Sequence, residues 1–140
     1  MNAPDIGGIH HLMLTVSDLN RSQKFYTEVL GFKVYGGSVE GGFVVMTNGQ
    51  LLMGINLPPD PSKTPKNDQF SEHRLGLDHL SLTVDNHDAL LNAAHMFDEK
   101  GVPHGNIEDL RAIGFPVYVL AFRDPDNIQL ELTAPAPAVQ

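Results

Sequence analysis

The sequence predicts an α+β protein made of two consecutive modules that share the element order βαβββ. The first observation is a repeat: residues 11–16 (HLMLTV) recur almost unchanged as residues 79–84 (HLSLTV). The second is that a helical pattern ending in glycine follows each copy. The third is that three strand-like segments follow each helix. A motif that recurs together with its context indicates an internal duplication.

A helix is expected after each copy of the hexapeptide. In the first module Asp18 is the predicted N-cap and Gly31 the residue that follows the helix. In the second module Asn86 is the predicted N-cap and Gly101 closes the helix. The residues expected on the packed faces recur at helical spacing; they are Ser22, Phe25, Tyr26, Val29 and Leu30 in the first helix and Leu90, Ala93, Ala94 and Phe97 in the second.

Three strands are expected after each helix. Asn48 and Gly49 predict a hairpin turn in the first module, and residues 124–127 (DPDN) turn the last pair of strands in the second. The predicted strands are 32–38, 42–48, 51–57, 103–110, 115–123 and 128–134.

The chain has the length of one compact domain. We expect this domain to span 1–140, with modules at about 8–57 and 77–134. Four prolines within the connecting segment 58–76 predict an extended linker, because proline disrupts helices. The absence of cysteine excludes disulfides, thiolate metal ligands and a cysteine nucleophile.

Charge and hydropathy exclude two classes of partner. Nine scattered Lys and Arg residues and a net charge of −8 argue against nucleic acid. No apolar run approaches the roughly 18–20 residues that cross a bilayer. The N-terminus, MNAPDIGG, lacks the basic and apolar stretches of a secretory signal. We therefore expect a cytoplasmic protein with no membrane partner.

Three residues share the polar faces of the predicted strands. Side chains alternate between the two faces of a strand. His11, His79 and Glu131 therefore lie opposite the aliphatic residues that pack under the helices. Two imidazoles and one carboxylate make a ligand set that leaves open positions on a divalent metal.

Alternatives to metal binding remain for these residues. Most histidines on strands form ordinary hydrogen bonds, and Glu131 could face solvent. The recurrence of the histidine at the same place in both modules favours ligation. Outside this set, we expect His73 and His104 to be exposed, and His87 and His95 to lie on the outer side of the second helix.

Three motifs in order resemble the vicinal oxygen chelate superfamily, which includes glyoxalase I, extradiol dioxygenases, and fosfomycin- and bleomycin-resistance proteins. They are residues 11–18 (HLMLTVSD), 25–32 (FYTEVLGF) and 124–131 (DPDNIQLE). The resemblance covers about residues 8–134 and implies a glyoxalase-like half-barrel fold. It also implies that His11, His79 and Glu131 are the metal ligands.

The family often supplies a fourth ligand from the fourth strand. Aligning the two turns puts Met53 at the position of Glu131, so this chain has no carboxylate there. A three-ligand site is similar to the dioxygenase and fosfomycin branches. We expect Fe(II) as the first choice, with Mn, Ni or Zn possible. The resemblance further implies a homodimer whose sites take His11 from one chain and the other two ligands from its partner.

The leading functional hypothesis is a metal-dependent enzyme that acts on a small substrate through adjacent oxygens, with a ring-cleavage dioxygenase preferred. A glyoxalase-type isomerase or lyase is the runner-up. A fosfomycin-type transferase is disfavoured, because this chain has Met13 at the position where a resemblance to those enzymes implies a threonine. A non-catalytic binder similar to bleomycin-resistance proteins and a purely structural metal remain further alternatives.

One second-sphere residue is a candidate. Counting back through a four-residue turn pairs Leu120 with Glu131 and Tyr118 with Thr133. Tyr118 would then lie on the metal face with Phe122 and could donate a hydrogen bond to substrate. The alternative is that Tyr118 only fills space in the pocket wall.

Overall fold

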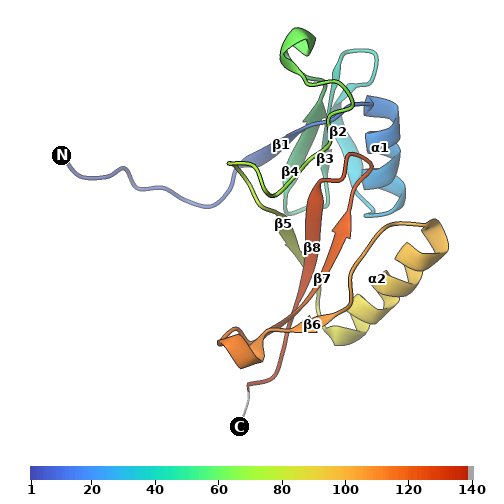
Figure 1. Ribbon diagram of the computed structural model, residues 1–140. Coiled ribbons are helices and arrows are strands. Elements are labelled where there is room, and N and C mark those ends of the chain that lie inside the picture. Colours follow the sequence, from blue (N-terminus) through green and yellow to red (C-terminus); the bar gives the residue numbers. More distant parts are fainter. Residues whose placement is uncertain (139–140) are drawn as a thin grey trace. The chain divides into compact units, whose positions relative to one another are not determined.

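The computed structural model describes residues 1–138 and contains two compact units with the same order of elements (Figure 1). Unit 1 is Met1–Pro65, and unit 2 begins at Lys66. Each unit holds one four-stranded sheet and one long helix. The predicted α+β class and the duplicated βαβββ order are confirmed. Among residues 1–138, no helix is long and apolar enough to span a bilayer.

In unit 1 the first strand lies at one edge of the sheet, beside the last strand. The strand order is β1-β4-β3-β2, with β1 parallel to β4 and the other pairs antiparallel. The elements are β1 (His11–Thr15), α1 (Leu19–Glu28), β2 (Lys33–Ser38), β3 (Phe43–Thr47), β4 (Leu52–Asn56) and, within the predicted linker, a short 3-10 turn (Pro61–Lys63).

Unit 2 repeats this topology in the order β5-β8-β7-β6. Its elements are β5 (Leu80–Thr83), α2 (His87–Lys100), β6 (Glu108–Asp109), a short 3-10 turn (Arg111–Ile113), β7 (Val117–Arg123) and β8 (Gln129–Pro135). The strand predicted at 103–110 is interrupted: His104 forms an isolated bridge with Phe122, and the strand β6 comprises only Glu108–Asp109, paired with β7. The N–H of Arg123 donates to the carbonyl of Pro103, and the N–H of Gly105 donates to that of Ala121, each at 2.9 Å, but residues 106–107 belong to no strand.

Three of the four helix ends follow the predicted caps; α1 ends earlier than predicted, with Val29 as its C-cap, so Gly31 lies two residues beyond the cap. The side chain of Asp18 accepts a hydrogen bond from the backbone of Arg21, and that of Asn86 accepts one from Ala89, each at 2.9 Å. Gly101 ends α2 in the left-handed conformation, with φ of 68°. These contacts satisfy backbone groups that the helix itself leaves unpaired.

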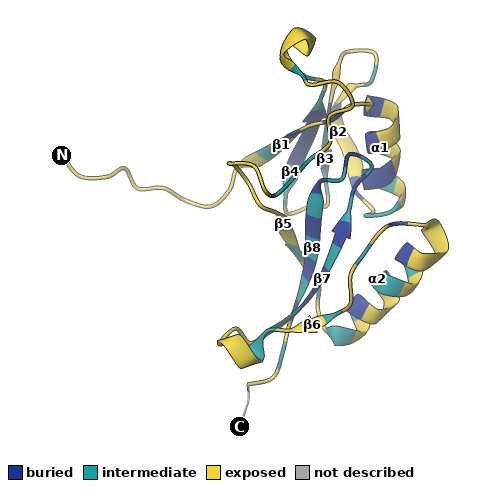
Figure 2. Ribbon diagram, in the orientation of Figure 1, coloured by how far each residue is buried: buried dark blue, intermediate teal, exposed yellow. Residues whose placement is uncertain are grey.

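One face of each sheet packs under its helix and forms the core (Figure 2). In unit 2, Phe97 of α2 stacks on Phe122 of β7 with ring centroids 4.6 Å apart. Each fully buried large apolar side chain contributes roughly 1.5–3 kcal/mol. The buried strand residues on these faces include Val44, Met46, Met53 and Ile55 in unit 1, and Leu120, Phe122, Leu130 and Leu132 in unit 2.

The second half of the predicted linker packs on unit 2. We call residues 66–76 the strap. The backbone N–H of Phe70 donates to the carbonyl of Asp126 at 3.0 Å, and the Asn127 amide donates to the carbonyl of Phe70 at 3.1 Å. Glu72 forms a two-point ion pair with Arg123, at 2.9 and 3.0 Å. The strap is therefore fastened to the β7–β8 hairpin.

Because of this ion pair, the stability of unit 2 should depend on pH in the acidic range. The hydrogen bonds from Arg123 lower the pKa of Glu72 from 4.5 to about 2, and the same pairing raises the pKa of Arg123. A lowered folded-state pKa contributes stability above the unfolded value and loses it as pH falls through the folded value. We expect wild type to melt above Glu72→Gln at pH 7, with the difference shrinking between pH 4.5 and 2. Equal melting temperatures at pH 7 would contradict this, and Glu99→Gln on the exposed side of α2 is the control.

Candidate metal site

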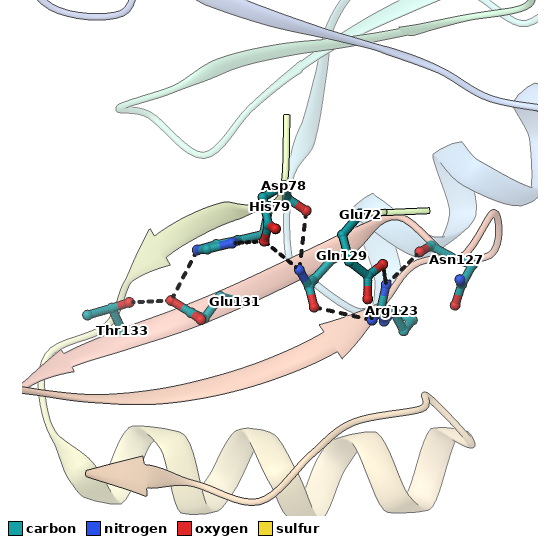
Figure 3. Close-up of polar contacts among 8 residues, drawn as sticks. All are labelled: Glu72, Asp78, His79, Arg123, Asn127, Gln129, Glu131 and Thr133. Atoms are coloured by element: carbon teal, nitrogen blue, oxygen red, sulfur yellow. Dashed lines mark hydrogen bonds and ion pairs between the residues drawn. The ribbon is translucent and has the colours of Figure 1, made fainter. Parts of the chain in front are cut away.

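The open face of the unit 2 sheet brings together two of the predicted ligands. Ser81 on β5 pairs with Glu131 on β8, so His79, just before β5, lies close to the carboxylate. His79 Nε2 and Glu131 Oε1 are 3.9 Å apart (Figure 3). The side chain of Glu131 is 19% exposed and that of His79 is 40% exposed, so both are accessible to a small ligand.

The other ring nitrogen of His79 is held by its neighbour. Nδ1 of His79 lies 2.7 Å from Oδ1 of Asp78. A carboxylate only accepts hydrogen bonds, so Nδ1 carries the proton and donates it. The neutral imidazole then has its lone pair on Nε2, which is the atom that faces Glu131. A metal-ligating histidine characteristically has this arrangement.

Hydroxyl groups surround the carboxylate on the same face. Thr133 Oγ1 donates to Glu131 Oε1 at 3.3 Å, and the hydroxyls of Ser81 and Thr133 contact each other. These groups fix the carboxylate without supplying a positive charge. Glu131 is therefore placed to neutralise part of the charge of a cation.

The two donor atoms fit a shared ion. Imidazole nitrogen and carboxylate oxygen each lie about 2.1 Å from a bound divalent metal, so two ligands of one ion are at most about 4.2 Å apart. The 3.9 Å between His79 and Glu131 falls within this limit. The backbone need not move for both side chains to reach one cation.

His11 occupies the corresponding place in unit 1. It is the first residue of β1, and its Nδ1 lies 2.8 Å from Nδ1 of His10. The preceding residue thus contacts the Nδ1 atom in both units, through an imidazole in unit 1 and a carboxylate in unit 2. Within residues 1–138, no group of three or more His, Asp and Glu side chains is gathered to hold a metal. The three-residue set therefore stays a prediction, with two members brought together in unit 2.

The strand pairing corrects the position that corresponds to Glu131. In unit 1 Met13 pairs with Gly54, as Ser81 pairs with Glu131 in unit 2. The counterpart is therefore Gly54 and not Met53, which is buried on the helix side. A side chain added at Gly54 would collide with the thioether of Met13. Unit 1 thus fills with Met13 the place where a carboxylate would stand.

The predicted register of Tyr118 is also wrong. Tyr118 pairs with Ala134, and Ala121 pairs with Glu131. Tyr118 therefore lies on the helix side, where its ring meets that of His87 with centroids 4.7 Å apart. The role expected for Tyr118 beside the metal loses its geometric basis. Phe122 is likewise buried under α2 and is no part of the metal face.

The register error at Tyr118 has an identifiable cause. The hairpin between β7 and β8 holds five residues, whereas the hairpin between β3 and β4 holds four. Ile128 belongs to the longer turn, since its backbone N–H donates to the Asp124 carboxylate at 2.8 Å. Asn127 adopts a left-handed conformation there, with φ of 64°. The extra residue moves every pair by one, and a shift of one reverses the faces.

Two other expectations about histidines are corrected. His87 is half-buried against Tyr118 and does not lie on the outer side of its helix. His104 is half-buried as well, with Nε2 bonded to Asp98 at 2.9 Å and Nδ1 to the carbonyl of Gly105 at 2.7 Å. These hydrogen bonds raise the pKa of His104, the bond to Asp98 most strongly. Both residues have structural partners in unit 2.

Sequence reasoning missed two polar residues beside the pair. Asp78 bonds the ring of His79, and Gln129 bonds Asp78. An acidic residue directly before the repeated histidine was the available signal for Asp78. The alternation along β8 places Gln129 on the face of Glu131, but alternation does not indicate which partner an amide binds.

Comparisons with known proteins agree on one family. The model of the Glyoxalase/Bleomycin resistance protein/Dioxygenase superfamily matches residues 8–132. The chain is 30% identical over 129 residues to the uncharacterized protein YwkD of Bacillus subtilis (strain 168), covering 89% of this chain and 94% of that protein.

Solved structures show the same fold. A glyoxylase/bleomycin resistance protein/dioxygenase domain from Frankia sp. EAN1pec has a TM-score of 0.74 at 28% identity over 96% of each chain. Lactoylglutathione lyase from Agrobacterium tumefaciens has a TM-score of 0.70 at 19% identity, covering 94% of this chain and 96% of that one. The fosfomycin resistance protein FosX from Mesorhizobium loti has 0.64 at 17% identity over 93% of each chain.

Proposed function

Because the chain belongs to the glyoxalase/bleomycin resistance protein/dioxygenase superfamily, we propose that it is a divalent-metal-dependent enzyme with His11, His79 and Glu131 as ligands. The observation that carries this proposal is the His79–Glu131 pair, whose donor atoms lie 3.9 Å apart on the open face of a sheet. The hydrogen bond from His79 Nδ1 to Asp78 supports it, because that bond leaves Nε2 able to bind a cation.

The ligand set determines what kind of substrate fits. Two neutral imidazoles and one carboxylate leave a divalent ion with a net positive charge. That charge favours a small substrate that offers two adjacent, partly anionic oxygens. Gly54, at the counterpart of Glu131, adds no further negative charge. A metal held by His11, His79 and Glu131 would supply Lewis-acid activation of the substrate oxygens and, as Fe(II), redox chemistry with dioxygen.

The leading reaction is ring-cleavage dioxygenation with Fe(II). A set of two histidines and one carboxylate is typical of non-haem Fe(II) oxygenases, because it leaves positions for both substrate and oxygen. Mn, Ni and Zn remain possible metals. A glyoxalase-type isomerisation needs a base that moves a proton between carbons, and the counterpart of Glu131 provides none.

Oxygen consumption tests this reaction. We expect full-length protein reconstituted anaerobically with Fe(II) to consume about one O₂ per catechol cleaved. An oxygen electrode measures the oxygen uptake with each member of a panel of catechols. Zn(II)-loaded protein should consume none, because zinc has no redox chemistry. Metal-loaded protein that takes up no oxygen with any member would contradict the dioxygenase. Incorporation of solvent deuterium into a 2-oxoaldehyde adduct would then favour an isomerase.

The assembly is part of the proposal. Unit 2 supplies an imidazole and a carboxylate, while unit 1 supplies the imidazole of His11. A homodimer in which each site takes His11 from one chain and the other ligands from its partner would have two equivalent sites, as two-fold symmetry requires. Normal ligand binding by metal-free protein would instead favour a non-catalytic binder.

A further inference from the structure

A continuous set of hydrogen bonds runs from the strap to His79 (Figure 3). It passes through four side chains, which we call the positioning network: Glu72, Arg123, Gln129 and Asp78. All four belong to unit 2, and every contact between successive members is 3.2 Å or shorter. None of them faces the cation directly in the proposed site.

Arg123 fixes the orientation of the Gln129 amide. Its guanidinium bonds both carboxylate oxygens of Glu72, and Nη2 also donates to Oε1 of Gln129 at 3.2 Å. A guanidinium has donors only, so the amide oxygen must face it. The amide nitrogen of Gln129 consequently points the other way, towards Asp78.

Gln129 in turn fixes Asp78. Its Nε2 donates to Oδ1 of Asp78 at 2.9 Å and to the backbone carbonyl of Asp78 at 3.2 Å. The two bonds hold the backbone and the carboxylate of one residue together. Asp78 is otherwise an exposed side chain, 64% accessible, that would sample several rotamers. The Gln129 contacts restrict it to the position in which Oδ1 accepts from His79.

The network is a property of unit 2 alone. In unit 1 the residue that contacts the ligand histidine is His10, and the counterpart of Gln129 is Leu52, which pairs with His11. Leucine can neither accept from a guanidinium nor donate to a carboxylate. The repeat has therefore diverged at the residues around the histidine while keeping the histidine itself.

From this geometry we propose that Asp78 and Gln129 are positioning residues for His79, and that the Glu72–Arg123 pair anchors them to the strap. The inference rests on the proposed metal site. Asp78 holds the ring of His79 with Nε2 towards Glu131. Packing of the strap and metal affinity are then linked, because disturbing Glu72 or Arg123 frees the amide of Gln129 to rotate.

Metal affinity of full-length variants tests the network. The probe is Co²⁺, whose visible absorption reports both affinity and coordination. Gln129→Glu keeps an acceptor for Arg123 but has no donor for Asp78, and Asp78→Ala removes the partner of His79. We expect each to weaken Co²⁺ binding about 10–100-fold, the usual effect of losing a residue that orients a ligand. Asp78→Asn, which can still accept from His79, should recover part of the loss.

Matched controls separate positioning from charge and folding. Gln50→Glu makes the same change in an exposed turn, and Asp85→Asn removes a charge elsewhere in unit 2. Neither should change the affinity, and metal-free Gln129→Glu should melt close to wild type. Wild-type affinity in both Asp78→Ala and Gln129→Glu would overturn the network. An equal loss of affinity in Gln50→Glu would also overturn it.

The same titrations distinguish this failure from failure of the site itself. If wild type binds Co²⁺ tightly and Glu131→Gln does not, the site stands, whatever the Asp78 and Gln129 variants show. If wild type binds Co²⁺ no better than Glu131→Gln, the proposed site fails, and the network has no metal ligand to position.

Discussion

Replacing Glu131 with glutamine is expected to weaken the binding of a divalent cation at least about 100-fold. Loss of a residue that merely orients a ligand costs 10–100-fold, and Glu131 is the only anion in the proposed set. Its carboxylate lies 3.9 Å from Nε2 of His79 and is fixed by the hydroxyl of Thr133. A neutral amide oxygen would keep the shape of the site without the charge.

Calorimetric titration of Co²⁺ into metal-free wild type and Glu131→Gln measures this effect. The variant should fold normally, because a glutamine oxygen can still accept from Thr133. We expect the melting temperature of the metal-free protein to change by about 3 °C or less. Glu99→Gln, an exposed residue of α2, is the control with equal chemistry. Tight Co²⁺ binding by Glu131→Gln would remove Glu131 from the ligand set.

Much of the fold could be predicted from the sequence because its signals are local. Asp18 and Asn86 are capping residues, and both cap their helices in the structure. The repeated hexapeptide predicts two equivalent strands, and β1 and β5 occupy equivalent places in their sheets. The strand predicted at 103–110 is interrupted, because a sequence pattern does not reveal which backbone groups find a partner.

Register could not be predicted, because it depends on counting turn residues. Asp124, Pro125, Asp126 and Asn127 all favour turns, so the turn was expected to end before Ile128. In the structure the Asp124 carboxylate binds the backbone N–H of Ile128 and draws it into the turn. This one residue moved Tyr118 to the helix side. Turn composition shows that a hairpin exists, but not how many residues it holds.

The candidate site was predictable only where it follows from alternation along a strand. Alternation and repetition single out His79 and Glu131, which the structure brings to 3.9 Å. Asp78 and Gln129 were not given a role, because hydrogen bonding between side chains depends on rotamers that a sequence pattern does not encode. The contribution of His11 is a question about assembly, and assembly leaves no periodic signal in the sequence.

Mixing two inactive variants is expected to restore metal binding, if the sites are shared between chains. His11→Ala removes the proposed ligand of unit 1, and Glu131→Gln removes a proposed ligand of unit 2. Neither homodimer then holds an intact site. In a heterodimer, one site combines both damaged halves, whereas the other takes intact His11 from the Glu131→Gln chain and intact Glu131 from the His11→Ala chain. Two-fold symmetry therefore predicts one working site per heterodimer.

Two affinity tags, one on each variant, isolate the heterodimer after co-expression. Its Co²⁺ content should reach about half that of wild type, compared with little for either variant alone, because one of two equivalent sites is intact. Co-expressed His11→Ala and Glu99→Gln chains provide the reference, because their heterodimer has one site without His11 and one intact site. If the sites lie within one chain, each chain of the His11→Ala and Glu131→Gln heterodimer still lacks a ligand, and no binding returns. Half occupancy would mean that His11 of one chain binds the metal together with ligands of the other chain. If no metal binds, His11 and His79 of the same chain belong to the same site.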